Sequence, residues 1–149
     1  MKIEIIPIQR IFYLRRIGCY GEENKQLMAT LKEKLKEASL FNEDTIIYGI
    51  AWSELNTPKE MCIYDVCVTV SAEQNIIEEM KETVLEGGKY AIFKIKHTEK
   101  EIQRFWEKFM QQNFQKEIVI IADLNRPILE RYTGRLIAAG YCEFCVPIE

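Results

Sequence analysis

The 149-residue sequence is poor in histidine and contains no long basic or long apolar run. A single histidine, His97, argues against a Ser–His or Cys–His catalytic pair and against a zinc site, which needs four convergent ligands. No run of five or more basic residues occurs and the net charge is −3, so we expect no direct binding to nucleic acid. No stretch approaches the roughly 18 apolar residues of a membrane span, and the charged N-terminus lacks the apolar segment of a signal peptide. We therefore expect a cytoplasmic protein without a membrane partner.

Cysteine occurs five times, and this odd number favours free thiols in a reducing compartment. The spacing of Cys142 and Cys145 is found in redox and zinc motifs, but here it lies in a predicted strand, where positions i and i+3 face opposite ways. Cys62 and Cys67 are five residues apart and meet the same objection. We interpret these cysteines as small core residues and predict neither a metal nor a cofactor.

The hydrophobic pattern predicts a single α+β domain. With 48% hydrophobic and 29% charged residues, the chain has ample material for one core. Helical periodicity predicts helices over residues 23–41 and 98–113, the second with Thr98 as its N-cap. Alternation predicts strands over residues 45–54, 61–70, 85–97, 128–132 and 139–148. Residues 3–15 also favour a strand, bent at Pro7, and residues 115–125 favour a strand although part of them also fits a short helix.

Both halves of the chain follow the order strand, helix, strand, strand, which indicates a duplication. The first repeat covers about residues 1–72 and the second about residues 84–149 of one domain spanning 1–149. Two such units can join edge to edge into one antiparallel sheet with pseudo-twofold symmetry and both helices on one face. The other face, near the pseudo-twofold axis, is then a natural concave site. The pair Gly87-Gly88 precedes a strand and predicts a turn.

The stretch RPILERYTG, residues 126–134, contains a carboxylate with two competing interpretations. Glu130 either pairs at the surface with Arg126 or Arg131, or shares a strand face with Tyr132 and points into a cavity. Surface pairing is the common outcome, because acidic residues are rarely buried. In a cavity the pKa of the carboxyl group would rise, and the group could hold a cation or transfer a proton.

Aromatic residues concentrate at strand positions and strand ends. Trp52 ends a predicted strand just before a polar loop, where an indole can line a cavity mouth, and Tyr20 lies in the turn before the first helix. A carboxylate beside several aromatic rings suits a flat lipophilic ligand, especially a cation, because the rings supply contact area and cation–π attraction.

Five segments together resemble the gyrase-inhibitor-like (GyrI-like) small-molecule-binding family. They cover nearly the whole chain in order: RRIGCYGEE, YGIAWSELNTPKEMCIYDVCVTV, GGKYAIFKIKHTEKEIQRFWEKF, RPILERY and AGYCEFCVPI. The family includes effector-binding domains of multidrug-responsive and AraC-type bacterial regulators. The resemblance implies two strand-helix-strand-strand units with an aromatic pocket between them and a glutamate near its centre. That acidic position is matched here by Glu130 in LERY, with Tyr132 on the same face.

The leading functional hypothesis is binding of flat lipophilic small molecules, cations among them. The expected ligand-binding residues are Glu130, Tyr132, Trp52, Tyr20, Tyr64 and Trp106. Because the first predicted strand starts at the N-terminus, we expect a stand-alone sensor domain, and exposed edge strands permit a homodimer. The resemblance also implies an alternative, a hydrolase of strained cyclopropane-type electrophiles, in which Glu130 would activate water and Tyr64 would donate a proton. Another, implied by the resemblance alone, is an interaction protein that binds DNA gyrase.

Overall fold

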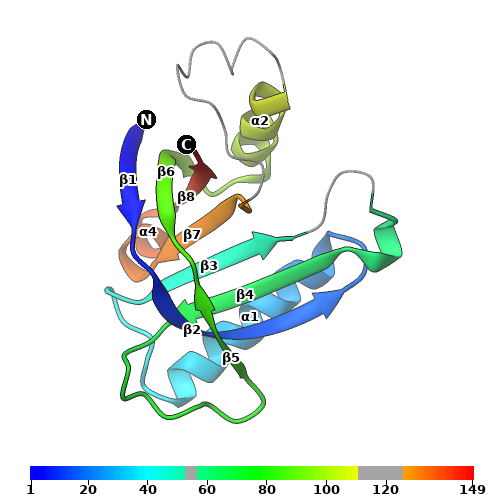
Figure 1. The fold of residues 1–149 in the computed structure, drawn as a ribbon. Coiled ribbons are helices and arrows are strands. Elements are labelled where there is room, and N and C mark those ends of the chain that lie inside the picture. The colour runs from blue at the N-terminus through cyan, green and yellow to red at the C-terminus, as the bar shows by residue number, and fades with distance from the viewer. Residues whose placement is uncertain (53–56, 111–125) are drawn as a thin grey trace.

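The computed structural model describes residues 1–52, 57–110 and 126–149. Within these residues, eight antiparallel strands form one curled sheet in the order β1-β6-β8-β7-β3-β4-β2-β5 (Figure 1). The strands are β1 (Lys2–Ile6), β2 (Gln9–Ile17), β3 (Ile46–Ala51), β4 (Ile63–Thr69), β5 (Lys81–Leu85), β6 (Gly88–Lys96), β7 (Leu129–Thr133) and β8 (Tyr141–Pro147). The helices are α1 (Glu22–Glu37), α2 (Glu99–Met110) and α4 (Gly134–Ala139), with a short 3₁₀ turn η1 (Lys59–Met61). The predicted α+β class is confirmed.

The strand order is symmetric about the junction between β7 and β3. On one side lie β7, β8 and β6, and on the other side β3, β4 and β2, as two strand-helix-strand-strand units require. Each unit also receives an edge strand from the other, because β1 pairs with β6 and β5 pairs with β2. Strand β5 was missed in the sequence, since the segment KETVL is mostly charged and exposed and carries little alternation. The predicted strand over 115–125 lies outside the described residues.

Turns at the edges of the sheet lie at the proline and glycine residues that predicted a bend or a turn. Pro7 separates β1 from β2, and the pair Gly87-Gly88 joins β5 to β6. Gly87 has a φ of 73°, and a Cβ atom there would lie 2.3 Å from the backbone oxygen of Ile6. The turn therefore packs too closely on the β1–β2 junction for any residue other than glycine.

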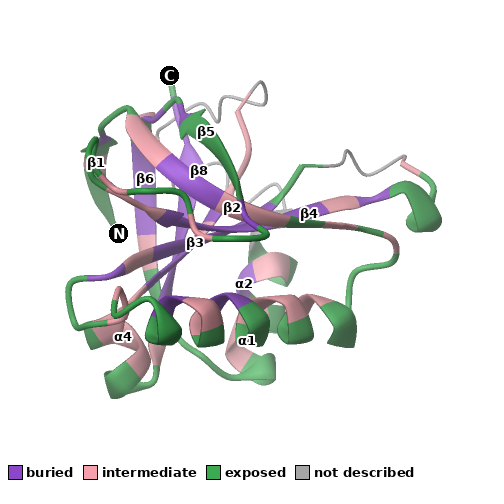
Figure 2. Ribbon diagram, turned by 90° about the horizontal axis from the view of Figure 1, so that it is seen from below, coloured by how far each residue is buried: buried purple, intermediate pink, exposed green. Residues whose placement is uncertain are grey.

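Helix α1 lies against the sheet through residues spaced one turn apart. Leu31 and Leu35 are fully buried, and Leu27 packs against the same core. Each fully buried leucine contributes roughly 1.5–3 kcal/mol of transfer free energy. Figure 2 shows buried residues along the strands and on the side of α1 that faces them.

Helix α2 covers the same face of the sheet as α1. As predicted, Thr98 caps it, because the Thr98 hydroxyl oxygen accepts a hydrogen bond from the Glu101 backbone N–H at 3.3 Å. The Phe105 ring stacks on Phe144 of β8 with centroids 4.6 Å apart. The helix starts also meet through an exposed ion pair between Lys25 and Glu99. The predicted packing of both helices on one face is confirmed. No described helix is long and apolar enough to cross a membrane.

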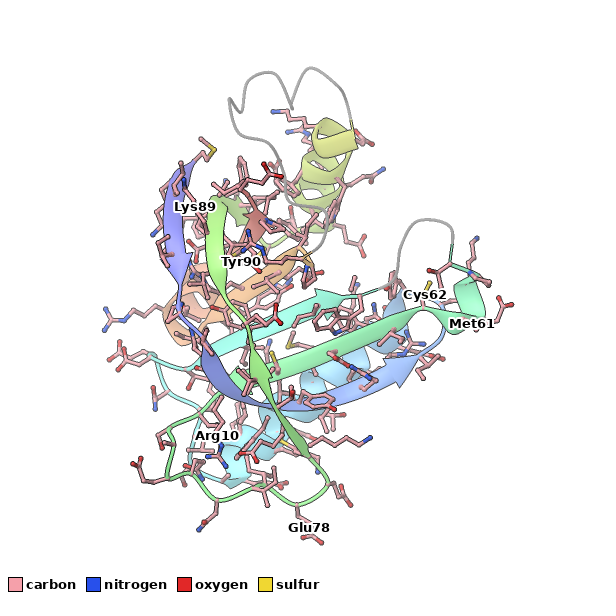
Figure 3. All side chains as sticks on the ribbon, viewed as in Figure 1. Arg10, Met61, Cys62, Glu78, Lys89 and Tyr90 are labelled. Carbon is pink, nitrogen blue, oxygen red and sulfur yellow. The ribbon has the colours of Figure 1, made fainter. Side chains whose placement is uncertain are left out.

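The two faces of the sheet carry separate cores, and side chains project from both faces (Figure 3). We call the face covered by α1 and α2 the helix face; its core includes Phe12, Leu31, Ile47, Tyr64, Val66, Phe105, Tyr132 and Phe144. We call the opposite face the inner face; its core includes Ile6, Ile11, Tyr48, Ile50, Cys67, Leu85, Tyr90 and Leu129. Because strands from both edges and from the centre meet in the second cluster, the sheet curls around the inner face. Cys142 lies in the first core and Cys145 in the second, as alternation predicted.

Candidate site on the helix face

Glu130 lies near the middle of β7, at the centre of the sheet. It is opposite Gly49 of β3 and Phe144 of β8 in the strand register, so all three belong to the helix face. Tyr132, two residues further along β7, donates a hydrogen bond from its hydroxyl to Glu130 Oε2 at 2.7 Å. The alternation that pairs these two side chains in the sequence is therefore confirmed.

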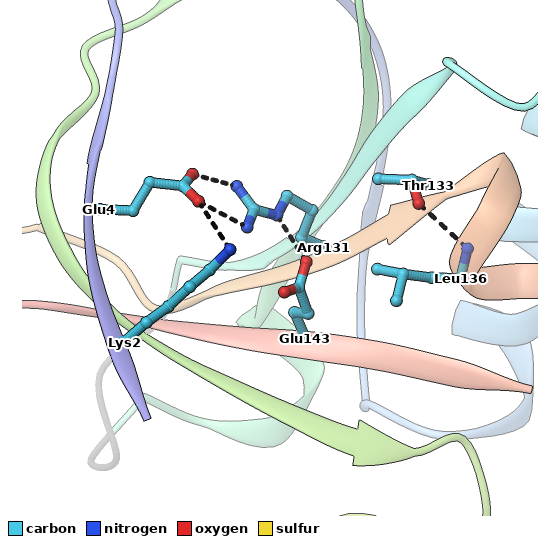
Figure 4. A network of polar contacts seen from close by, with 6 residues as sticks. All are labelled: Lys2, Glu4, Arg131, Thr133, Leu136 and Glu143. Carbon is cyan, nitrogen blue, oxygen red and sulfur yellow. Dashed lines mark hydrogen bonds and ion pairs between the residues drawn. The ribbon is translucent and has the colours of Figure 1, made fainter.

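The two neighbouring arginines do not pair with Glu130. Arg131 points to the inner face, where it binds Glu143 of β8 and Glu4 of β1 (Figure 4). Arg126 donates hydrogen bonds to the backbone oxygens of Gly87, Lys89 and Ile148. Among the described residues, no cationic side chain forms an ion pair with the Glu130 carboxylate. The interpretation of Glu130 as a surface carboxylate paired with these arginines is wrong.

Gly49 makes room for the polar cluster around Glu130. A Cβ atom at this position would lie 2.5 Å from the Tyr64 hydroxyl oxygen and 3.5 Å from Glu130 Oε2. Three oxygen-bearing side chains, Glu130, Tyr64 and Tyr132, thus meet over a strand position without a side chain. Sequence analysis did not single out Gly49, although a glycine inside a predicted strand is a signal of close approach.

Burial controls the ionisation of this cluster. It raises the pKa of Glu130 above its ordinary value, while the hydrogen bond from Tyr132 acts in the opposite direction. Burial, and then the charge of Glu130, raise the pKa of Tyr64 and of Tyr132. Both hydroxyls therefore stay protonated and serve as hydrogen-bond donors beside the carboxyl group.

Further aromatic rings flank the cluster. The Tyr20 ring lies edge-on to Tyr64 at 6.1 Å, and its hydroxyl donates to the Ile63 backbone oxygen at 3.0 Å. Trp106 of α2 packs edge-on against Phe144, with centroids 5.2 Å apart. His97, which sequence analysis did not assign here, places its ring 5.3 Å from that of Tyr132. Burial lowers the pKa of His97, as do Lys32 and Lys25, so its ring is neutral at pH 7.

Trp52 does not belong to this group, although the sequence suggested it. Its indole Nε1 donates to Asp65 Oδ2 at 2.7 Å, and Asp65 alternates with Tyr64 on β4, so Trp52 lies on the inner face. The structure thus brings together Glu130, Tyr132 and Tyr64, flanks them with Tyr20 and Trp106, and separates Trp52 by the thickness of the sheet. The expectation that the concave face would hold the site is likewise wrong for Glu130, which lies on the helix face.

The helix-face cluster offers one carboxyl group, hydroxyl donors and aromatic contact area, which suits a ligand better than a metal. Among residues 1–52, 57–110 and 126–149, no three His, Cys, Asp or Glu side chains are arranged to hold a metal ion. The cluster can bind an apolar molecule through the rings and can compensate a positive charge through Glu130.

Comparisons with known proteins identify relatives over the whole chain. The model of the "GyrI-like small molecule binding domain" matches residues 1–149. The chain is 35% identical over 149 residues to the "SPbeta prophage-derived putative transcriptional regulator YosT" of Bacillus subtilis (strain 168), covering 99% of this chain and 97% of YosT.

Two solved structures share the fold at low sequence identity. EcmrR in its complex with DNA has a TM-score of 0.72 and 12% identity over 99% of this chain, which spans only 56% of EcmrR. SAV2435, solved with tetraphenylphosphonium bound, has a TM-score of 0.61 and 16% identity over 99% of this chain and 93% of SAV2435. The full-length family match and the identity to YosT establish that this chain belongs to the GyrI-like family of small-molecule-binding domains.

Proposed function

We propose that the chain binds lipophilic cations on the helix face, with Glu130 as the counter-charge. The observation that carries the proposal is the setting of this carboxyl group. It is held by the Tyr132 hydroxyl among aromatic side chains, and no described cationic side chain is paired with it. A ligand cation would provide the missing opposite charge.

The raised pKa of Glu130 predicts how cation binding depends on pH. Burial disfavours the ionised carboxylate, and a positive charge nearby favours it again. Binding of a cation would therefore be coupled to loss of a proton from Glu130. Affinity for the cation should be highest above the pKa of Glu130 and should fall as the pH is lowered through it.

The aromatic rings near the carboxyl group account for the lipophilic part of the proposed ligand. Tyr64 and Tyr132 adjoin the carboxyl group, Tyr20 extends the surface toward solvent, and Trp106 lies beside Phe144. These rings attract a cation through their faces and give a flat or ring-bearing ligand contact area. SAV2435, which shares this fold, binds tetraphenylphosphonium, a cation of this chemical class.

The test is calorimetric binding of tetraphenylphosphonium to the wild type and to Glu130→Gln. The substitution keeps the shape of the side chain and removes its charge, so we expect affinity to fall about tenfold or more. The uncharged hydrocarbon triphenylmethane should bind both proteins within about twofold, because it carries neither a charge nor a hydrogen-bond acceptor.

A matched control separates local charge from overall charge. Glu33→Gln removes the same charge from an exposed position on α1 and should leave tetraphenylphosphonium affinity unchanged. Equal binding of the cation by wild type and Glu130→Gln, or an equal loss in Glu33→Gln, would contradict the role given to Glu130.

A further inference from the structure

A cavity lies on the inner face, across the sheet from Glu130. Its volume is about 320 Å³, near the lower end of the roughly 300–1,000 Å³ typical of small-molecule sites. Five residues of the inner core line it: Ile11, Ile50, Cys67, Leu85 and Tyr90. The side chains of Tyr13, Trp52 and Tyr90 add aromatic surface, and Tyr90 is labelled in Figure 3. The cavity thus combines an apolar, ring-lined part with the charged residues Arg15, Asp65, Glu86 and Arg126, and the Glu130 cluster does not use it.

The polar end of the cavity is built around Asp65. Arg15 Nε donates to Asp65 Oδ1 and Arg15 Nη2 to Oδ2, each at 2.8 Å, while Trp52 Nε1 donates to Oδ2 at 2.7 Å. Only 6% of the Asp65 side chain is exposed, against 42% of Arg15. Both carboxylate oxygens are therefore occupied, and the indole of Trp52 is fixed at the cavity wall.

This end of the cavity presents hydrogen-bond donors. Two of the five N–H groups of Arg15 bind Asp65, and no other described residue accepts a hydrogen bond from the remainder. A second guanidinium, that of Arg126, also lines the cavity and lies over the Tyr90 ring at 5.0 Å. A ligand that fits this end must supply acceptor oxygens, and a carboxylate matches a guanidinium best.

We propose that the inner cavity is a second binding site, for flat aromatic carboxylates, and that it is separate from the proposed cation site. The aromatic part of such a ligand lies against Trp52, Tyr13 and the apolar floor, and its carboxylate accepts from Arg15. The two faces of one sheet would then select ligands of opposite charge.

The chain has two tryptophans, which allow ligand binding on the two faces to be measured separately. Trp52 lines the inner cavity, and Trp106 packs beside Phe144 on the helix face. In protein labelled with ¹⁵N-tryptophan, the two indole N–H signals are assigned with Trp52→Phe and Trp106→Phe. Three probes share one ring system and differ in the charge of the head group: 2-naphthoate, 2-naphthalenemethanol and 2-naphthylmethylammonium.

We expect 2-naphthoate to shift the Trp52 signal in a saturable way and to leave Trp106 unmoved. It should bind about fivefold or more tightly than the uncharged alcohol, because its hydrogen bonds to Arg15 are charge-assisted. A Trp52 signal that does not move at millimolar 2-naphthoate overturns the proposal. The ammonium probe tests the proposed Glu130 site independently through Trp106, so failure of one site is distinguishable from failure of the other.

Two variants test the residues that define the cavity. Arg15→Gln should reduce the affinity for 2-naphthoate to that for the alcohol. Since this change also removes the ion-pair partner of Asp65, Thr83→Phe provides a second test at an exposed edge position opposite Ile11 in the register. The larger side chain should occupy the cavity mouth and abolish the Trp52 shift. Full binding of 2-naphthoate by both variants would overturn the assignment of this site.

Discussion

Gly49 shows how strongly a single atom can matter on the helix face. The position has no side chain, and the Tyr64 hydroxyl occupies the space that a methyl group would need. Because both neighbouring strands are hydrogen-bonded to β3, the backbone at Gly49 cannot move away without disturbing the sheet centre. Glycine is required here by what lies over it.

We predict that Gly49→Ala destabilises the protein by about 1–3 kcal/mol through overpacking against Tyr64. The free energy of unfolding is measured by urea denaturation of the wild type and the variant. The double variant Gly49→Ala/Tyr64→Phe removes the oxygen that the new methyl group meets. Gly49→Ala should therefore cost much less stability in the Tyr64→Phe protein than in the wild type. The difference between the two costs, the coupling energy, should be about 1 kcal/mol or more. Additive losses would show that the conflict does not involve the Tyr64 hydroxyl.

At the scale of elements, Arg131 ties three strands together on the inner face. Its Nε donates to Glu143 Oε1 of β8 at 3.0 Å, and its Nη1 donates to Glu4 Oε2 of β1 at 2.5 Å. Among the described strands β1 pairs only with β6, so this link from β7 is a second attachment of the edge strand. The hydrogen bond from Arg131 lowers the pKa of Glu4, against the opposing effect of burial.

This network predicts a specific loss of stability in acid. The folded-state pKa of Glu4 lies below the usual 4.5, so its contribution is present above that value and is lost as the pH falls through the folded-state pKa. Between about pH 6 and pH 3, the free energy of unfolding should therefore fall less in Glu4→Gln than in the wild type. Urea denaturation at several pH values measures this. Glu33→Gln, which removes an exposed carboxylate, serves as the control. Equal acid sensitivity of Glu4→Gln and the wild type would refute the role of Glu4.

At the scale of the whole molecule, the two repeats exchange their first strands. β1 precedes β2 in the chain but pairs with β6, and β5 precedes β6 but pairs with β2. The core of the helix face also mixes residues from both halves, such as Leu31 with Phe144. Neither repeat can therefore complete its sheet or its core alone.

We predict that fragments 1–80 and 81–149 are each largely unfolded alone and form native-like structure when mixed in equal amounts. Each fragment leaves an unpaired strand edge and half of each core exposed, which is insufficient for a small domain. Circular dichroism of the separate and mixed fragments measures this. A cooperative unfolding transition in fragment 1–80 alone would show that the repeat is an independent unit.

Local patterns in the sequence predicted much of this architecture because they report local physical constraints. The spacing of Leu27, Leu31 and Leu35 required a helix with one buried side, and the alternation through Tyr64, Asp65 and Val66 required a strand with two distinct faces. Strand β5 and helix α4 were missed. The first is a charged edge strand, and the second is a short helix whose start depends on the Thr133 hydroxyl accepting from the Leu136 N–H (Figure 4).

The sequence by itself determined the fold class, the turns and the pairing of Glu130 with Tyr132 on one strand face, because alternation and turn chemistry act over a few residues. Only the tertiary structure decided whether that strand face belongs to the helix face or to the inner face of the sheet. It placed Glu130 on the helix face, Arg131 and Trp52 on the inner face, and the Tyr64 hydroxyl over Gly49. These outcomes depend on the register of neighbouring strands and on the face that α1 and α2 cover, and residues far apart in the chain set both.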